Sequence, residues 1–394
     1  MTQVTRKSLV VLAMLAGNLL PVSAHARSTL VVPAQFPTIQ SAVDFAAPGD
    51  TIKVLPGTYA EQVLIDKELT LKGAGASKTI IQAPPTLMPH AEDPVDRAGR
   101  PTTEIVLVTN GADVAMSGFT VTGPVSGMCD PLRPRRVLRR IAGIRVINGA
   151  TLDLRDSRVT GIRENPLGLC NNGNGIGVGL TTINFAGGSV GHATIKNVRV
   201  DDYQEDGIFV SGPGSTATIS ENVVTGQGPS PLQEHLGIVI VDRAVATVTR
   251  NTISGHLCNV PNECGPDFFS QIQSYGIAAY GVDPGSGPGP GTVISENNVV
   301  NNDVGILVAD GVGCCTVSEN TVTNNRFMGV VFFDGSFTTS ENVITGGDVG
   351  IQVIAATVDT VAVLHEDVIT GTSIAPVQEL SCCGVTATAI VQTE

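Results

Sequence analysis

The sequence predicts an all-β protein whose chain winds into a stack of short, similar coils. A Gly followed by Ile or Val opens a short apolar strand eight times, from Gly143-Ile144 to Gly350-Ile351. Alternating Thr or Ser and apolar residues follow these openings, as is typical of β-strands. The openings lie 21 to 39 residues apart, and no long helical period separates them. Such a repeat fits one solenoid coil of three strands, each pairing with its equivalent about 4.8 Å away.

Parallel crossovers of this kind are right-handed in nearly all proteins. The tight six-residue steps of a left-handed solenoid are missing from the sequence. We therefore predict a right-handed parallel β-helix of about ten coils over residues 51–394. The column of repeated Ile residues, with Ile208, Ile238 and Ile306 among them, should line up in its core.

The N-terminal residues predict a leader and a cap. Residues 1–26 have a positive start, a 12-residue apolar run and a small-x-small cleavage site, Ala24-His25-Ala26, as in a secretory signal peptide. Residues 27–50 contain an amphipathic helix with Thr38 as its N-cap, and Pro48-Gly49-Asp50 ends it. This helix should cover the open end of the solenoid. We expect a secreted protein, periplasmic or extracellular, without a membrane span.

Two residue types recur at the predicted corners. The repeated Gly is expected to serve the backbone at a corner rather than bind phosphate. An Asn recurs at one phase of the repeat and should adopt the left-handed bend, with its side chain stacking as a ladder. These residues are Asn222, Asn251, Asn297, Asn320 and Asn342.

The N-terminal motifs resemble a known superfamily. The stretches 38–43, 48–52, 56–61 and 69–73 are similar to the opening of right-handed parallel β-helix, pectin-lyase-like proteins. That group includes pectin methylesterases and periplasmic β-helix proteins of the nitrous-oxide-reductase-maturation type. The resemblance implies the fold over residues 29–370. The sequence lacks the catalytic residue sets of pectin methylesterases and polygalacturonases. Asp201-Asp202 occurs without the other residues of such a set.

Charge and composition restrict the classes of binding partner. The formal net charge is −13, so the surface repels nucleic acid. We expect a monomer whose partner is a polysaccharide or an extracellular protein. Long segments precede several Gly-Ile strands and should stack on one side of the solenoid, where loops usually carry function. These segments are 123–142, 161–174, 226–236 and 255–274.

The residues that point outward from the Gly-Ile sheet are mostly apolar or small. This argues against a long acidic groove and against a glycosidase, which needs two carboxylates across one bond. The row is also a candidate contact surface for a partner, because exposed apolar rows mark interfaces. It comprises Arg145, Gly177, Phe209, Val239, Ala278, Leu307, Val331 and Gln352.

An acidic cluster before the third repeated strand is the strongest candidate site. Arg145, Asp202 and Asp206 are the catalytic candidates, and Asp201 with Glu205 could hold Ca²⁺. Together they suggest a Ca²⁺-assisted lyase acting on an acidic polysaccharide. The alternative is that these acidic loops are solvated and pair with the arginine-rich segment 133–140. Candidate substrate-binding residues are Tyr203, Phe209, His235 and Tyr275.

Eight cysteines fit an oxidising compartment. Cys129 and Cys170 lie in loops of adjacent coils and can form a staple, and Cys258 with Cys264 can close a small ring. The adjacent pairs 314–315 and 382–383 are about three coils apart, roughly 14 Å, too far to bridge each other. Each is left as a vicinal disulfide or as thiols.

Three functions remain open from the sequence alone. The first is a secreted protein that binds or cleaves an acidic polysaccharide. The second is a non-catalytic solenoid that presents a surface to a partner or an envelope polymer. The third is a metal-maturation accessory protein. Apart from the possible Ca²⁺, the sequence implies no cofactor.

Overall fold

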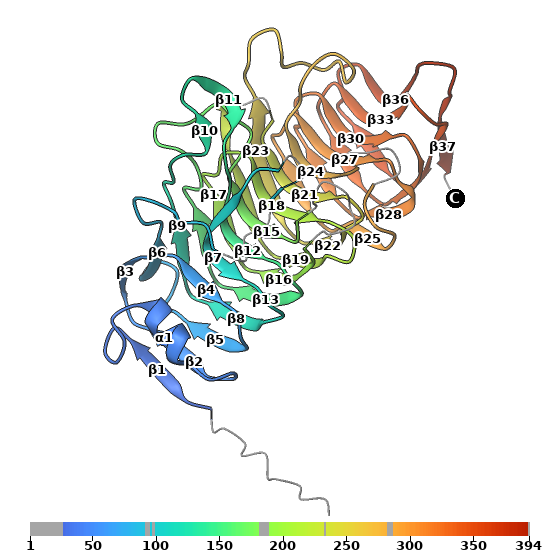
Figure 1. The fold of residues 1–394 in the computed structure, drawn as a ribbon. Coiled ribbons are helices and arrows are strands. Elements are labelled where there is room, and N and C mark those ends of the chain that lie inside the picture. The colour runs from blue at the N-terminus through green and yellow to red at the C-terminus, as the bar shows by residue number, and fades with distance from the viewer. Residues whose placement is uncertain are drawn as a thin grey trace, which may run out of the picture.

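The computed structural model describes residues 27–90, 95–96, 99–180, 189–231, 234–281 and 287–392. Its chain winds as a right-handed parallel β-helix (Figure 1), which confirms the predicted fold class. Three long parallel sheets run along the solenoid, and each coil adds one strand to each of them. The predicted signal peptide, residues 1–26, lies outside the described residues. No helix in the described part of the chain is long and apolar enough to span a membrane.

Sheet I has 13 strands. They are β1 (Thr29–Val32), β2 (Thr51–Val54), β5 (Leu69–Lys72), β8 (Asp113–Ser117), β13 (Ala150–Arg155), β16 (Gly191–Lys196), β19 (Thr216–Ser220), β22 (Val245–Thr249), β25 (Thr292–Ser295), β28 (Val312–Ser318), β31 (Ser336–Ser340), β34 (Thr360–His365) and β37 (Ala387–Gln392).

Sheet II has 11 strands, most of them short. They are β3 (Gly57–Ala60), β6 (Thr79–Gln82), β9 (Thr120–Thr122), β14 (Arg158–Thr160), β17 (Arg199–Asp201), β20 (Val223–Ser230), β23 (Thr252–Cys258), β26 (Asn298–Val300), β29 (Thr321–Thr323), β32 (Val343–Thr345) and β35 (Val368–Thr370).

Sheet III contains the repeated Gly-Ile strands and also has 11 members. They are β4 (Val63–Ile65), β7 (Thr102–Val108), β12 (Arg140–Val146), β15 (Asn174–Val178), β18 (Asp206–Ser211), β21 (Leu236–Val241), β24 (Tyr275–Tyr280), β27 (Val304–Ala309), β30 (Met328–Phe333), β33 (Val349–Ala355) and β36 (Ala375–Ser381). An antiparallel hairpin of β10 (Cys129–Asp130) and β11 (Arg133–Val137) precedes β12.

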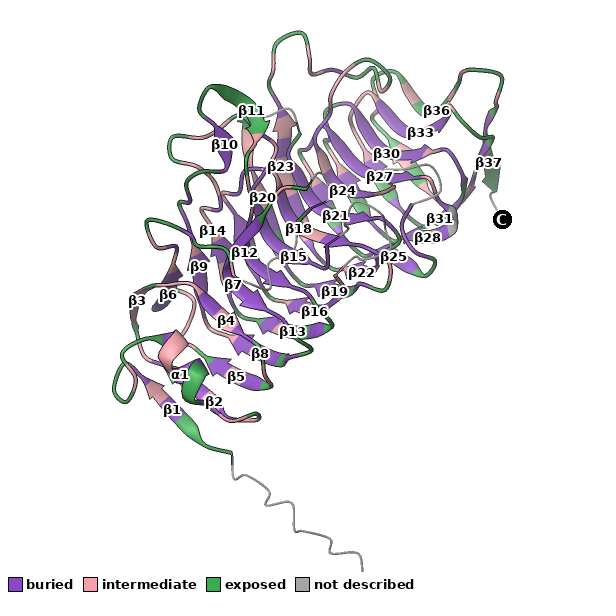
Figure 2. Ribbon diagram, viewed as in Figure 1, coloured by how far each residue is buried: buried purple, intermediate pink, exposed green. Residues whose placement is uncertain are grey.

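The interior of the solenoid is a column of aliphatic side chains. Ile208 pairs with Ile238, Ile238 with Ile277, and Ile277 with Ile306, and all four are fully buried. The predicted column of repeated Ile is therefore confirmed. Figure 2 shows that burial follows the strands, while exposure gathers in the loops and at the ends of the stack.

The repeated glycines allow the coils to approach closely. A Cβ on Gly207 would lie 2.6 Å from the carbonyl oxygen of Gly237, and one on Gly237 would lie 2.3 Å from that of Gly276. No side chain fits at such distances. These glycines do serve the backbone, as predicted, but by close approach of one coil to the next rather than by a left-handed bend.

The predicted asparagine ladder is present. Each side-chain amide donates to the side-chain oxygen of the next coil at 2.7 to 3.0 Å, through Asn222, Asn251, Asn297, Asn320, Asn342 and Asp367. The prediction that these Asn adopt the left-handed bend is wrong. The preceding residues adopt it, with φ of 59° at Glu221, 56° at Arg250 and 57° at Glu296. Their side chains face solvent, whereas each Asn turns inward to bond along the stack.

A short helix, α1 (Ile39–Phe45), sits against the first coils near β1, β2 and β4 (Figure 1). Thr38 caps it, accepting a hydrogen bond from the Ser41 backbone N–H, and the helix buries Ile39, Ala42 and Val43. The predicted amphipathic helix and its N-cap are confirmed. Its apolar face covers core residues at this end of the solenoid.

Candidate active site

The predicted outward row exists as one register column on sheet III. Arg145 pairs with Gly177, Gly177 with Phe209, Phe209 with Val239, and the column continues to Gln352. Most of the row is nevertheless covered, since Val239 and Val331 are fully buried and Leu307 is 7% exposed. The expectation of an exposed apolar contact surface is wrong. The long loops pack their own side chains over the row.

A cleft of about 460 Å³ opens on the outer face of sheet III, over strands β12 to β24. Its lining is rich in ionisable groups, with more carboxyl groups than arginines. The carboxyl groups are Asp96, Glu205, Asp206, Glu234 and Asp242, and the arginines are Arg100, Arg140 and Arg145. Phe209, Leu236, Val241 and Tyr280 supply apolar wall. An apolar cleft with a few convergent polar groups is the usual form of a small-molecule site.

Asp206 is the buried carboxyl group of this cleft. It begins β18, pairs in register with Leu236 of the next coil, and is only 4% exposed. No described residue donates a hydrogen bond to its carboxyl group. Burial, followed by the nearby Glu205, raises the pKa of Asp206 well above its usual range, and Arg140 offsets only part of this effect. Burial in the wall of the cleft therefore favours the protonated form of Asp206.

Glu205, the preceding residue, forms an ion pair. Its Oε2 lies 2.5 Å from Nη1 of Arg140, whose Nε lies 3.1 Å from Oδ2 of Asp96. Arg100 contacts the same Asp96 oxygen at 2.6 Å. Burial alone would lower the pKa of Arg140, but Glu205 and Asp96 raise it above its usual range. Two adjacent carboxyl groups thus lie in different surroundings, one buried with a raised pKa and one paired with an arginine.

Two further groups complete the mouth of the cleft. Glu234 faces the cleft on one side and is exposed on the other. Burial on the cleft side, followed by the nearby Glu205, raises the pKa of its carboxyl group. Burial, followed by Asp206, raises the pKa of the Tyr280 hydroxyl well above its usual range. Tyr280 therefore remains a neutral hydroxyl group at any physiological pH. Tyr280, the last residue of β24, was missed as a site residue from sequence, because nothing in the repeat marks it.

Arg145 lies at the floor of the cleft, at its N-terminal end. Its side chain is 2% exposed and forms an ion pair through Nε with the fully buried Glu104 of β7. Nη1 of Arg145 is buried without a hydrogen-bond partner, and it lies 3.1 Å from where a Cβ on Gly177 would be. The sequence placed Arg145 on the outer face correctly. It gave no sign that Glu104, one coil earlier, would balance the charge.

The predicted grouping of Asp201 and Asp202 with Asp206 is wrong. Asp201 ends β17 in sheet II, where it accepts hydrogen bonds from Arg158, Arg199 and Thr160. Asp202 contacts Arg163 at 2.5 Å and lines a different hollow. The chain turns a corner between these residues and Glu205, so the four carboxylates separate onto two faces. Asp201 and Glu205 therefore do not face a common Ca²⁺ site.

Two predicted substrate-binding residues are buried in the solenoid instead. Tyr203 and His235 are both fully buried and pack against His256, with ring centroids 4.9 Å apart for Tyr203 and His235. Nδ1–H of His256 donates to the amide oxygen of Asn302, so Nε2 accepts a hydrogen bond from the Tyr203 hydroxyl group. Burial lowers the pKa of His235 to about 3 and that of His256 to about 4. This neutral cluster belongs to the interior and cannot reach a substrate.

The two other predicted substrate-binding residues lie on the outer face. Phe209 is half-buried and lines the cleft. Tyr275 packs with Phe209 and Tyr280 around Leu236, Val239 and Val241, and its hydroxyl donates to Gln273. A role for both in substrate binding stays a prediction, and Phe209 has the contact with the cleft that this role requires.

The predicted disulfides are present. Cys129 and Cys170 are bonded, with Cα atoms 5.6 Å apart, and so are Cys258 and Cys264. Cys314 and Cys315 form a vicinal disulfide, whereas Cys382 and Cys383 are thiols. The sequence left each adjacent pair open as a vicinal disulfide or as two thiols, and one pair has each of these states.

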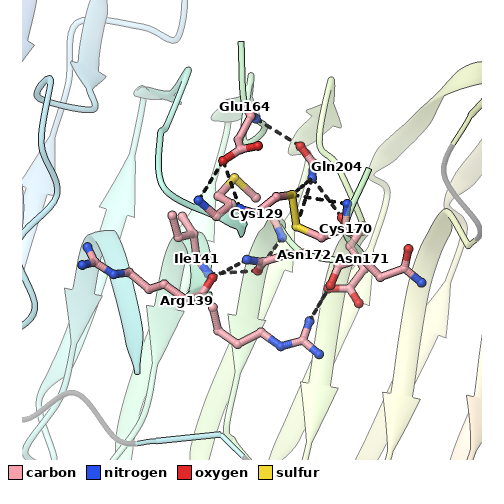
Figure 3. Close-up of a disulfide and its surroundings, with 12 residues drawn as sticks. Cys129, Arg139, Ile141, Glu164, Cys170, Asn171, Asn172 and Gln204 are labelled. Atoms are coloured by element: carbon pink, nitrogen blue, oxygen red, sulfur yellow. Dashed lines mark hydrogen bonds and ion pairs between the residues drawn. A yellow bond between two sulfur atoms is a disulfide. The ribbon is translucent and has the colours of Figure 1, made fainter. Parts of the chain in front are cut away.

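The first disulfide fastens the loops beside the cleft (Figure 3). Glu164 accepts hydrogen bonds from the backbone of Met128 and Cys129, and Gln204 donates to the Cys170 carbonyl at 2.9 Å. Asn172 joins Arg139 and Ile141 across the same loops. This network fixes the backbone from which Arg140 enters the cleft. Arg135 of the hairpin also pairs with Glu263 of the second disulfide loop at 3.0 Å.

Comparison with known proteins identifies the fold. A family model described as a right handed beta helix region matches residues 181–362. The structure is similar to a lacto-N-biosidase of Eubacterium ramulus, with TM-score 0.58 and 10% identity over 93% of this chain and 68% of that one. It is also similar to the catalytic unit of an α-1,3-glucanase of Streptomyces thermodiastaticus, with TM-score 0.57 and 16% identity over 92% and 67%.

An alginate lyase of a Paenibacillus species is similar more weakly, with TM-score 0.45 and 14% identity over 91% of this chain and 99% of that one. No curated protein matches the sequence. The chain thus has the fold of a right-handed parallel β-helix, and at these identities the structural likeness establishes the fold alone.

Proposed function

We propose that this protein processes carbohydrate outside the cytoplasm, by acid–base hydrolysis of a glycosidic bond in the sheet III cleft. The observation that carries the proposal is the pair of adjacent carboxyl groups in different surroundings. Asp206 is buried and its pKa is raised, while Glu205 forms an ion pair with Arg140. Glycoside hydrolysis needs such a pair, one acid and one carboxylate flanking the bond. The proposal revises the expectation from sequence that the apolar outer row excludes a glycosidase.

The groups can act in a balanced step. The Asp206 carboxylic acid gives its proton to the glycosidic oxygen as the bond to the anomeric carbon breaks. Water adds to that carbon, and its proton passes to the Glu205 carboxylate, which Arg140 holds in place. Glu234 at the mouth is a second candidate for the water-activating role, and Tyr280 can donate a hydrogen bond to a sugar oxygen.

The charge balance of the cleft favours a neutral substrate. Each lining arginine already has a carboxylate partner: Arg100 and Arg140 share Asp96, and Arg145 has Glu104. The lining still holds more carboxyl groups than arginines. A uronate polymer would therefore meet net repulsion, whereas a neutral glycan would not. The two neighbours with TM-scores above 0.5 are by their titles a lacto-N-biosidase and an α-1,3-glucanase, which supports the same direction.

Two features support a location outside the cytoplasm. Three disulfides need an oxidising compartment to persist. Residues 1–26 have the pattern of a secretory signal peptide. N-terminal sequencing of the protein recovered from culture fluid or periplasm would test this, with Arg27 as the expected first residue.

Hydrolysis is tested with a panel of oligosaccharides and with one substitution. The panel contains α-1,3-linked gluco-oligosaccharides, N-acetylhexosamine-containing oligosaccharides, alginate and pectate, each with Ca²⁺ and with a chelator. We expect new reducing ends from a neutral member, and Asp206→Asn should lower the turnover rate about 10²- to 10⁴-fold. Because Asp206 must be protonated, the rate should fall as pH rises through its raised pKa.

Asp113→Asn is the matched control, since Asp113 is exposed on sheet I far from the cleft. It should leave the rate unchanged. Unsaturated product from alginate or pectate that depends on Ca²⁺ would favour the polyuronate lyase instead. Failure of the wild-type protein to cleave any member would contradict an enzymatic role on these glycans and favour a binding module.

A further inference from the structure

The cleft does not continue along the solenoid toward the C-terminus. On the next coils the outward residues Leu307, Val331 and Ile354 are almost completely buried. Phe268, from the loop between β23 and β24, covers them and stacks on Phe333 with ring centroids 5.2 Å apart. Tyr280 belongs both to the cleft lining and to this apolar cluster. It is therefore the end wall of the cleft on this side.

The opposite end is closed in a similar way. Leu107 and Ile147 are fully buried on the outer face and form a small cluster with Leu180. Leu180 also lines the cleft, so this cluster is the second end wall. Arg145 lies beside it at the floor, buried together with Glu104. Both ends of the cleft along the solenoid axis are thus walls of packed apolar side chains.

A cleft closed at both ends cannot hold the middle of a polymer. A chain that lies along the solenoid axis and is bound at its middle must leave the site in both directions, and here this axis is blocked both ways. A chain in this orientation can therefore enter only by its end. The volume of about 460 Å³ lies in the range typical of a small-ligand pocket rather than an extended groove.

One buried group is ready to contact that chain end. Nη1 of Arg145 has no hydrogen-bond partner, and its side chain is 98% buried at the cleft floor, within the lining. An unpaired buried donor is costly unless a ligand or water supplies an acceptor. Because Glu104 already balances the positive charge, the fitting acceptor is a neutral hydroxyl, ring or carbonyl oxygen rather than a carboxylate.

From these observations we infer that the protein removes a short unit from the end of a neutral glycan, with Arg145 binding the terminal sugar. The inference rests on the proposed hydrolytic function and adds to it the part of the substrate that is recognised. Arg145 lies two coils from Asp206, about 9.6 Å along the solenoid axis, and Asp206 lies three residues before Phe209, the residue in register with Arg145, about 10 Å along the strand. The two Cα atoms are thus about 14 Å apart, and the released unit spans about two or three sugar rings.

The time course of products tests chain-end action. Linear α-1,3-linked gluco-oligosaccharides and N-acetylhexosamine-containing oligosaccharides of increasing length, with a fluorescent label at the reducing end, are incubated with the wild-type protein. We expect one short unlabelled product from the first time points, while the labelled remainder shortens stepwise. A cyclic oligosaccharide of the cleaved linkage, which has no end, should stay intact.

Arg145→Lys tests the assigned residue, because lysine keeps the charge beside Glu104 but lacks the second nitrogen of the guanidinium group. We expect KM to rise about tenfold or more with a smaller change in kcat, and Arg155→Lys on sheet I should change neither constant. If Arg145→Lys does not fold by circular dichroism, the neutral pair Glu104→Gln with Arg145→Gln replaces it. An unchanged KM in the folded variant would overturn the role of Arg145.

The outcomes separate the two proposals. Labelled fragments of intermediate length at the first time points, or cleavage of the cyclic substrate, would overturn chain-end action and leave hydrolysis standing. No cleavage of any linear probe would contradict the hydrolytic function itself.

Discussion

The outer face of sheet III has two halves built on the same columns of residues, and they differ in what covers them. From β12 to β24 the face is a polar cleft, with Asp206 paired in register to Leu236. From β27 to β33 it is an apolar cluster, with Val304 paired to Tyr275 and to Met328 in the same column. The solenoid repeat thus supplies equivalent positions on each coil. The side chain at a position and the loop that covers it decide whether the position lines a polar cleft or an apolar cluster.

The largest expected effect comes from placing a carboxyl group in the apolar half. Val304→Asp would put an unpaired charge at a fully buried position in the column that contains Asp206. We expect a loss of about 3–5 kcal/mol in the free energy of unfolding at pH 7, because the nearby Arg326 is already paired with Asp303 and the new carboxylate would be buried without a partner. Urea denaturation followed by circular dichroism measures it.

Val304→Ala is the control for lost packing and should cost about 2 kcal/mol. Val304→Asp should lose more free energy of unfolding than Val304→Ala, and this difference should shrink below about pH 4, where a carboxyl group accepts a proton more readily. Equal losses for the two variants at pH 7 would mean that water reaches this half, and that the two halves do not differ as described.

An intermediate effect is expected from the disulfide beside the polar half. Replacing Cys129 and Cys170 by Ala removes a bond that spans 41 residues and should cost about 2–4 kcal/mol. Hydrogen exchange should increase over residues 129–174, because the bond fastens the loops that carry Arg140. The matched pair Cys258→Ala with Cys264→Ala spans only six residues and should cost less.

If the loss of the Cys129–Cys170 bond increased exchange uniformly along the chain, the bond would stabilise the whole solenoid rather than the wall of the cleft. Exchange confined to residues 129–174, with a lower cleavage rate, would instead tie the bond to the site.

The smallest expected effect has the opposite sign. The folded protein raises the pKa of Asp206, so between the unfolded pKa of about 4 and the raised value the unfolded state has already released this proton. Stability is therefore lost as pH rises through that window. Asp206→Asn should stabilise the protein by about 1 kcal/mol at pH 7 while lowering the turnover rate, and the gain in stability should vanish below about pH 4. A destabilised variant at pH 7 would show that the carboxylate has a partner in the fold.

The sequence predicted the stack, the Ile core column and the outward row because strand periodicity fixes which way each side chain points. It could not predict which residues of the outward row are covered, because Phe268 and Leu180, which pack over this face, come from loops that do not follow the repeat. Arg145 was placed on the correct face, but its neutralisation by Glu104 depends on pairing between coils 41 residues apart. Tyr203 and His235 were misassigned because corner residues have no periodicity to orient them.

The parallel pairing of sheet III has a consequence for how such a site can change. It ties successive coils in register, from β12 through β15 to β18, so the spacing along the axis between groups on different coils is set in whole steps of about 4.8 Å. Inserting or deleting a coil would lengthen or shorten the room between Arg145 and Asp206 by one such step without altering either group. The length of the pocket therefore changes only by whole coils, and variants that differ in the number of coils would bind ligands of correspondingly different length.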